Sequence, residues 1–189
     1  MTEQCLIIIC GPTAVGKTAV IKHLLRRLPQ LKTGITYTTR AKRPHTKEDK
    51  VMYYVSAKQF EQKIRNDQLL EWATYNNDYY GSARQENLAI LKKHPLLLNL
   101  EIKGSLQVKK LFPKALLVFI APENLDQISQ RLKRRRLSPA VFKQRLANAQ
   151  WTLKQASKFD YQVVNRENQL DFTVSQIAKI IKAYCAFKA

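Results

Sequence analysis

The segment that decides the fold is GPTAVGKT at residues 11–18, which matches the pattern G-x-x-x-x-G-K-T. A short apolar run ends where this segment begins, and a stretch with helical periodicity follows it. Glycines in such a turn let backbone amides point at phosphate oxygens, and the helix N-terminus adds further unpaired amides. The segment therefore predicts a nucleoside triphosphate site in which Lys17 reaches the β and γ phosphates and Thr18 ligates Mg²⁺ through its hydroxyl. The residues expected to line the triphosphate are Gly11, Pro12, Thr13, Ala14, Val15, Gly16, Lys17, Thr18 and Ala19.

Outside this segment, short runs rich in Leu, Ile and Val alternate with segments of helical period. Such alternation indicates strands joined by helical crossovers in a parallel sheet. The fold class that we predict is α/β, with a P-loop NTPase-type parallel sheet flanked by helices. The core strands are expected at residues 5–10, 95–102, 115–121 and 161–165, and the core helices at 17–28, 105–112, 124–135, 139–156 and 171–187.

Residues 34–82 interrupt this rhythm. The runs ITYTTR, MYYV and LLEWATY alternate in the manner of strands around a short helical stretch at 57–66. Turn-forming residues at 76–78 favour a hairpin-like reversal before a helix that starts near Ser82. This part of the chain is therefore predicted to be a small inserted β-rich sheet.

The chain is strongly basic, with 33 Lys and Arg against 14 Asp and Glu among 189 residues, a formal net charge of +19. This charge predicts a polyanionic partner, and nucleotide phosphates, nucleic acid or an acidic membrane surface would each satisfy it. Residues 127–159 contain nine basic residues and no acidic one. We expect this surplus to cause weak, sequence-independent binding to nucleic acid, without a recognition motif for DNA or RNA.

The cysteines and the apolar runs indicate the compartment. The three cysteines, Cys5, Cys10 and Cys185, are too few and too unevenly placed for a disulfide framework or a zinc site, so Cys5 and Cys10 are expected to be core residues. The apolar runs are too short to span a bilayer, and the N-terminus lacks the features of a secretory signal. These features predict a soluble, cytoplasmic protein with no membrane partner.

Three further motifs resemble those of the guanylate kinase family. They are TTRAKRP at 38–44, EWA followed by YYGS within 71–82, and LLNLEIKGS at 97–105. The order of elements also resembles that family over nearly the whole chain. The resemblance implies phosphoryl transfer from MgATP to GMP, and also to dGMP. It further implies one domain with a core at 1–33, 83–130 and 150–189, an acceptor-binding insert at 34–82 and a lid at 131–149.

The resemblance also assigns roles within the insert. Arginines matching Arg40 and Arg43 hold the phosphate of GMP, as does a tyrosine matching Tyr80. Glu71 and Ser82 match the residues that read guanine, whose N1–H and amine are neighbouring donors that one carboxylate can accept together. The other matching contacts to GMP are Thr36 and Glu101.

On the ATP side, the resemblance implies that Arg131, Arg135 and Arg145 are lid arginines that stabilise the transferring phosphoryl group together with Lys17. Asn165 matches an asparagine beside the adenine ring. Its position at the end of a predicted strand is equally typical of a turn-forming residue.

Several positions depart from the family pattern, among them Arg136, where the family usually has a glycine. Met52 stands where the family has a phosphate-holding tyrosine, Asn99 where it has an aspartate near Mg²⁺, and Lys103 where it has a glutamine. Asn99 lacks a negative charge, which predicts a weaker contact to Mg²⁺ through water. Two alternatives stay open: a binding module of this family with little catalysis, and a related P-loop kinase with another acceptor. The intact Lys17 and Thr18 argue against a module without catalysis.

Overall fold

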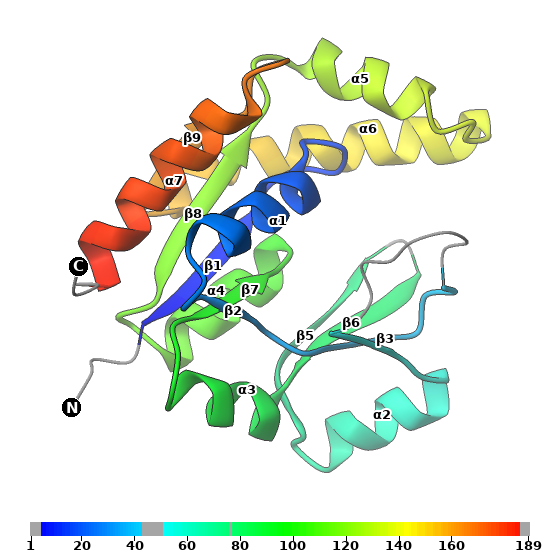
Figure 1. Ribbon diagram of the computed structural model, residues 1–189. Coiled ribbons are helices and arrows are strands. Elements are labelled where there is room, and N and C mark those ends of the chain that lie inside the picture. Colours follow the sequence, from blue (N-terminus) through cyan, green and yellow to red (C-terminus); the bar gives the residue numbers. More distant parts are fainter. Residues whose placement is uncertain (1–4, 43–50, 76, 186–189) are drawn as a thin grey trace.

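A computed structural model describes residues 5–42, 51–75 and 77–185. The strand that leads into the P-loop lies at the centre of a five-stranded sheet with the order β2-β7-β1-β8-β9 (Figure 1). Every neighbouring pair in this sheet runs parallel. The strands are β1 (Leu6–Cys10), β2 (Lys32–Thr33), β7 (Leu96–Asn99), β8 (Leu116–Ala121) and β9 (Tyr161–Val164).

Helices cover both faces of this sheet, because its central strands are apolar on both sides. In β1, Ile7 and Ile9 point into one hydrophobic cluster, while Leu6 and Ile8 point into the other. The helices α1 (Lys17–Arg27) and α7 (Leu170–Cys185) contribute to the first cluster, and α3 (Arg84–Leu91) and α4 (Ile102–Leu111) contribute to the second. Figure 1 shows α1 and α7 side by side on one face.

The insert forms a separate four-stranded sheet with the order β4-β3-β6-β5. One helix, α2 (Ala57–Arg65), packs on the side of this sheet that faces away from the core (Figure 1). There Phe60 stacks on Tyr79 with ring centroids 5.1 Å apart. The other side of the sheet faces the core. The strands are β3 (Thr36–Thr38), β4 (Met52–Tyr54), β5 (Leu69–Tyr75) and β6 (Asp78–Ala83).

Two helices follow β8 and lie at the top of Figure 1. The first is α5 (Leu125–Lys133), and the second, α6 (Pro139–Leu153), starts after Ser138, whose hydroxyl accepts a hydrogen bond from the Val141 amide. Arg136, in the turn between them, has a φ of 50°. This left-handed conformation favours glycine.

The α/β class and the parallel sheet are as predicted, but some bounds differ. The predicted strand 95–102 ends at Asn99, and α4 begins at Ile102 instead of residue 105, because Glu101 in extended conformation caps the helix there. The two-residue edge strand β2 was not predicted, since so short a strand has no measurable alternation. Among the helices that the structure describes, none is long and apolar enough to cross a membrane.

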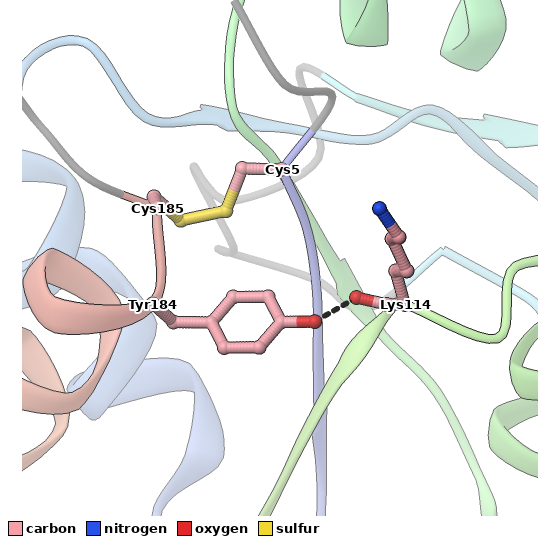
Figure 2. Close-up of a disulfide and its surroundings, with 4 residues drawn as sticks. All are labelled: Cys5, Lys114, Tyr184 and Cys185. Atoms are coloured by element: carbon pink, nitrogen blue, oxygen red, sulfur yellow. Dashed lines mark hydrogen bonds between the residues drawn. A yellow bond between two sulfur atoms is a disulfide. The ribbon is translucent and has the colours of Figure 1, made fainter.

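The expectation that the cysteines form no disulfide is wrong. Cys5 and Cys185 are joined by a disulfide with their Cα atoms 5.5 Å apart (Figure 2). The two cysteines are 180 residues apart in the sequence, so no local pattern indicates that they pair. Only the packing of α7 brings the end of this helix to the start of β1. Cys10 is a buried free cysteine, as expected.

Candidate active site

The P-loop connects the end of β1 to the start of α1. Gly11 and Gly16 have φ values of 151° and 104°. A Cβ atom on Gly11 would overlap the carbonyl oxygen of Ile120 in the neighbouring strand, so the loop can leave the sheet here only with glycine. These two glycines give the turn its shape for backbone amides to face a phosphate group.

Lys17, the first residue of α1, lies across this loop. Its Nζ donates hydrogen bonds to the carbonyl oxygens of Gly11 at 2.5 Å and Pro12 at 3.0 Å. Thr18 follows at the second helical position and is exposed. The structure therefore places a cation and an exposed hydroxyl at the mouth of the loop, where phosphates and a metal ion would meet.

Two side chains hold the P-loop from its outer side. The Nη1 atom of Arg131 donates to the carbonyls of Ala14 at 3.3 Å and Val15 at 3.0 Å. Asn165 Nδ2 also donates to the Val15 carbonyl, at 2.8 Å, and the hydroxyl of Thr173 in α7 donates to Asn165 Oδ1 at 3.1 Å. Asn165 is thus a buried link between the loop and α7, and its contact with adenine stays a prediction.

Arg131 has an acidic partner that sequence reasoning missed. Its Nη2 lies 2.5 Å from Glu167 Oε2. The hydrogen bond and the charge of Arg131 hold the pKa of Glu167 below its usual value. Glu167 therefore orients the Arg131 guanidinium toward the loop, but no sequence pattern links the two residues.

The three predicted lid arginines lie in different places. Arg131 is in α5 and contacts the P-loop, whereas Arg135 follows the end of α5 and is exposed. Arg145 is half-buried on α6, and its Nε is buried without a hydrogen-bond partner among the residues that the structure describes. The structure thus brings Arg131 to the P-loop. That Arg135 and Arg145 also reach the bound phosphates stays a prediction.

The second half of the site lies on the insert sheet, on the face turned to the core. Register pairing sets Ser82 opposite both Thr36 and Glu71, so these three side chains share that face. Glu71 Oε1 accepts hydrogen bonds from the Ser82 amide at 3.0 Å and the Ser82 hydroxyl at 2.7 Å. Both residues are buried. The predicted base-reading pair is therefore in contact.

Burial raises the pKa of Glu71 to about 7, against the opposing effect of the Ser82 hydrogen bonds and with a smaller contribution from the negative charge of Glu101. Desolvation disfavours the charged carboxylate. A ligand that donates two hydrogen bonds to this group would favour its charged form.

Gly104 in the first turn of α4 encloses Glu71 on the other side. A Cβ atom at this position would overlap Oε2 of Glu71 and lie 3.0 Å from its Cδ. Next to it, the Trp72 amide donates to Gln107 Oε1 at 3.4 Å. The insert strand β5 and the core helix α4 thus build the base site together, a contribution of Gly104 that sequence reasoning missed.

Arg40 lies beyond the end of β3, beside the same face. Its Nη2 is 3.2 Å from the hydroxyl of Tyr54 and 3.7 Å from Met52 Sδ, and its guanidinium lies 5.6 Å from the Tyr54 ring centroid. Tyr53 points to the opposite face, where it lies against Tyr37 with ring centroids 5.5 Å apart. Tyr54 thus brings a hydroxyl to Arg40 on the face that Met52 shares.

In this strand, Met52 pairs with Thr36 and Tyr54 pairs with Thr38. Tyr80 pairs with Thr38 from the other side, so it belongs to the same face. Period-two alternation from Met52 would have identified Tyr54. Arg43 lies outside the described residues.

Asn99 and Glu101 lie between the two halves of the site. Asn99 ends β7 beside Ile9 of β1, and Glu101 caps α4. The charge of Glu101 contributes, after burial, to the raised pKa values of both Cys10 and Glu71. Glu101 is therefore close to the strand of the P-loop and to the base site.

The residues present fit a Mg²⁺ ion that is held mostly by the nucleotide. Among the described residues, no cluster of three or more His, Cys, Asp or Glu could hold a metal ion. Mg²⁺ commonly keeps several waters and takes only one or two protein ligands beside substrate phosphates. The exposed Thr18 hydroxyl and the exposed Asn99 amide suit that role.

A P-loop on a parallel sheet, an arginine bound to that loop and a buried acceptor site on an inserted sheet define the class of P-loop kinases that act on small acceptors. The family model for guanylate kinase matches residues 3–184. The chain belongs to the guanylate kinase family.

Individual relatives agree with this assignment. A guanylate kinase of Desulfitobacterium hafniense is 38% identical over 180 residues, which cover 94% of this chain and 89% of the relative. One from Gloeobacter violaceus is 39% identical over 164 residues, which cover 85% and 79%. The crystal structure of a guanylate kinase from Anaplasma phagocytophilum matches 100% of this chain and 89% of its own with a TM-score of 0.80 and 22% identity, which supports the fold.

Proposed function

We propose that this protein transfers the γ-phosphoryl group of ATP to GMP, and also to dGMP, and so produces ADP and the nucleoside diphosphate. The observation that carries the choice of acceptor is the buried Glu71–Ser82 pair. A carboxylate accepts both the N1–H and the amine of guanine, but it would repel the unprotonated N1 of adenine. A base that leaves these buried groups unpaired loses roughly 1–3 kcal/mol for each.

The acceptor phosphate binds at the other end of the same face. Arg40 and Tyr80 lie there, with Tyr54 supplying the hydroxyl that Met52 lacks. Arg43, three residues after Arg40, adds a second guanidinium. Planar guanidinium groups bind phosphate in a bidentate manner, which orients the attacking oxygen.

Phosphoryl transfer needs positioning and positive charge more than a base. Lys17 exchanges its hydrogen bonds to the loop carbonyls for bonds to the β and γ phosphates. Arg131, Arg135 and Arg145 neutralise charge on the transferring group as the lid at 131–149 and the insert at 34–82 close over the core and exclude water. Thr18, and through water Asn99, would hold Mg²⁺, which would supply positive charge that offsets the negative charge of the phosphates.

The reaction belongs to purine nucleotide metabolism, and its partners are ATP and GMP. We assign it to the cytoplasm, where both nucleotides are available. The basic surface adds weak binding to nucleic acid, which has no part in the reaction.

The test is an ADP-release assay with MgATP and each of GMP, AMP, CMP and UMP as acceptor. We expect rapid turnover with GMP and little with the other three. Lys17→Ala is the matched control, because it removes the charge on the phosphates and leaves the base site intact. Equal or better use of AMP would refute the role of Glu71, and full activity of Lys17→Ala would refute the role of the P-loop.

A further inference from the structure

The two ends of the described chain meet beside the core sheet. Cys5 precedes β1, Cys185 is the last residue of α7, and a disulfide joins them. The hydroxyl of Tyr184 donates to the carbonyl of Lys114 in the segment before β8 (Figure 2). The last turn of α7 is thereby linked to the segments that precede β1 and β8.

Two segments of the chain connect this junction to the nucleotide-binding loop. From Cys5, the chain runs along β1 directly into Gly11. From Cys185, α7 runs back along α1 to Thr173, which is linked to the P-loop through Asn165. The disulfide therefore joins two residues 180 positions apart in the sequence, and the chain leads from each of them to the P-loop.

We propose that Cys5 and Cys185 form a reversible redox modification site whose co-reactants are low-molecular-weight disulfides and thiols, such as oxidised and reduced glutathione. Disulfides of cytosolic proteins are commonly transient and redox-sensing. A compartment that keeps thiols reduced opens this bond, and an oxidising shift closes it.

The exposure of the two residues determines the order of steps. Cys185 is half-buried, whereas Cys5 is only 6% exposed. The Cys185 thiolate attacks the small disulfide, whose S–S bond breaks, and a mixed disulfide forms as one thiolate leaves. The Cys5 thiolate then attacks the Cys185 sulfur and expels the second small thiolate. Two protein thiols are oxidised, and one small disulfide is reduced to two thiols.

Cys10 is an internal control for this chemistry. Its side chain is fully buried, and burial raises its pKa to about 11. Thiolates, not thiols, take part in exchange. Cys10 therefore remains a free thiol under conditions that oxidise the other two.

The disulfide joins residues that are 180 positions apart, so it restricts the unfolded chain far more than the folded one. We expect the oxidised protein to melt on the order of 10 °C above the reduced protein. The readout is structural, so it is independent of the activity proposed above.

The first experiment follows the thiols. The reduced full-length protein is incubated in buffers with an increasing ratio of oxidised to reduced glutathione. Each sample is then quenched, alkylated and analysed by mass spectrometry. The wild type should lose two alkylatable thiols and retain Cys10. Cys5→Ser should accumulate a mixed disulfide with glutathione at Cys185, and Cys185→Ser should accumulate none. Three free thiols in oxidised wild type, or oxidation at Cys10 first, would overturn the proposal.

The second experiment measures melting temperatures of Cys5→Ser, Cys185→Ser and the double variant, each in oxidising and reducing buffer. Comparing each variant with itself removes any loss of packing caused by serine. Only the wild type should gain stability on oxidation. The proposal fails if the wild type gains nothing, or if Cys185→Ser retains the full gain.

Discussion

At the scale of single residues, Glu71 makes the proposed activity dependent on pH. The pKa of its carboxyl is raised to about 7, foremost by burial, and only the ionised form accepts both guanine donors. As the pH falls through 7 the group becomes protonated, so affinity for GMP is present above this value and is lost below it. We expect the Michaelis constant for GMP to rise about tenfold between pH 8 and pH 6.

The control for this measurement is Glu71→Gln, which cannot ionise. The phosphate of GMP also titrates, with a second pKa of about 6, so part of the pH dependence belongs to the substrate. That part should remain in the variant. An identical pH profile in wild type and Glu71→Gln would show that the carboxyl does not control binding.

Tyr54 provides a second prediction at this scale, because its hydroxyl lies 3.2 Å from Arg40 Nη2. Tyr54→Phe keeps the ring under the guanidinium and removes only the hydroxyl. A hydrogen bond to a charged group contributes about 1.5–3 kcal/mol, so the Michaelis constant for GMP should rise about tenfold or more with little change in kcat.

Tyr53→Phe is the matched control, since Tyr53 is 51% exposed and lies on the other face of the same strand. It should leave the Michaelis constants for GMP and ATP within about twofold of wild type. Equal effects of the two substitutions would argue against a role for Tyr54 in phosphate binding.

At the scale of elements, the contact between α4 and β5 sets the shape of the base site. Gly104→Ala introduces a methyl group at the Glu71 carboxylate, so the carboxylate or the helix must shift. We expect the Michaelis constant for GMP to rise about tenfold or more while that for ATP stays nearly constant. Steady-state kinetics in both substrates checks this, and an unchanged constant for GMP would contradict it.

Alanine has a better helix propensity than glycine, which would favour the helix by about 1 kcal/mol and offset the cost of displacing the Glu71 carboxylate. Thermal unfolding of Gly104→Ala should therefore show little loss of stability. A large loss would mean that the kinetic effect reflects damage to the fold.

At the scale of the whole molecule, the net charge of +19 exceeds what one nucleotide site needs. Arg134 and Arg136 are exposed in the segment between α5 and α6. Replacing both with Gln should leave phosphoryl transfer nearly unchanged but weaken binding to single-stranded RNA. In a plot of the logarithm of the RNA-binding constant against the logarithm of the salt concentration, the slope should become less steep by up to about 1.4. Each lost phosphate contact accounts for about 0.7 of this slope.

Filter binding or fluorescence anisotropy over a range of salt concentrations measures this slope. Arg135→Gln distinguishes charge that serves catalysis from charge that only binds RNA. This substitution should reduce turnover strongly, because the transferring phosphoryl group loses a stabilising charge. Tight RNA binding that persists at high salt would contradict a purely electrostatic, sequence-independent interaction.

The sequence by itself determined the class of the fold, the P-loop and the Glu71–Ser82 pair. These features depend on local chemistry: glycines where the backbone must turn, apolar runs with the period of strands and helices, and motifs whose residues lie close together in the chain. Tertiary structure alone decided the rest, including the link from Arg131 to Glu167, the enclosure of Glu71 by Gly104 and the disulfide between Cys5 and Cys185. The physical reason is that each of these contacts joins elements far apart in the chain, and only their packing brings the partners within bonding distance.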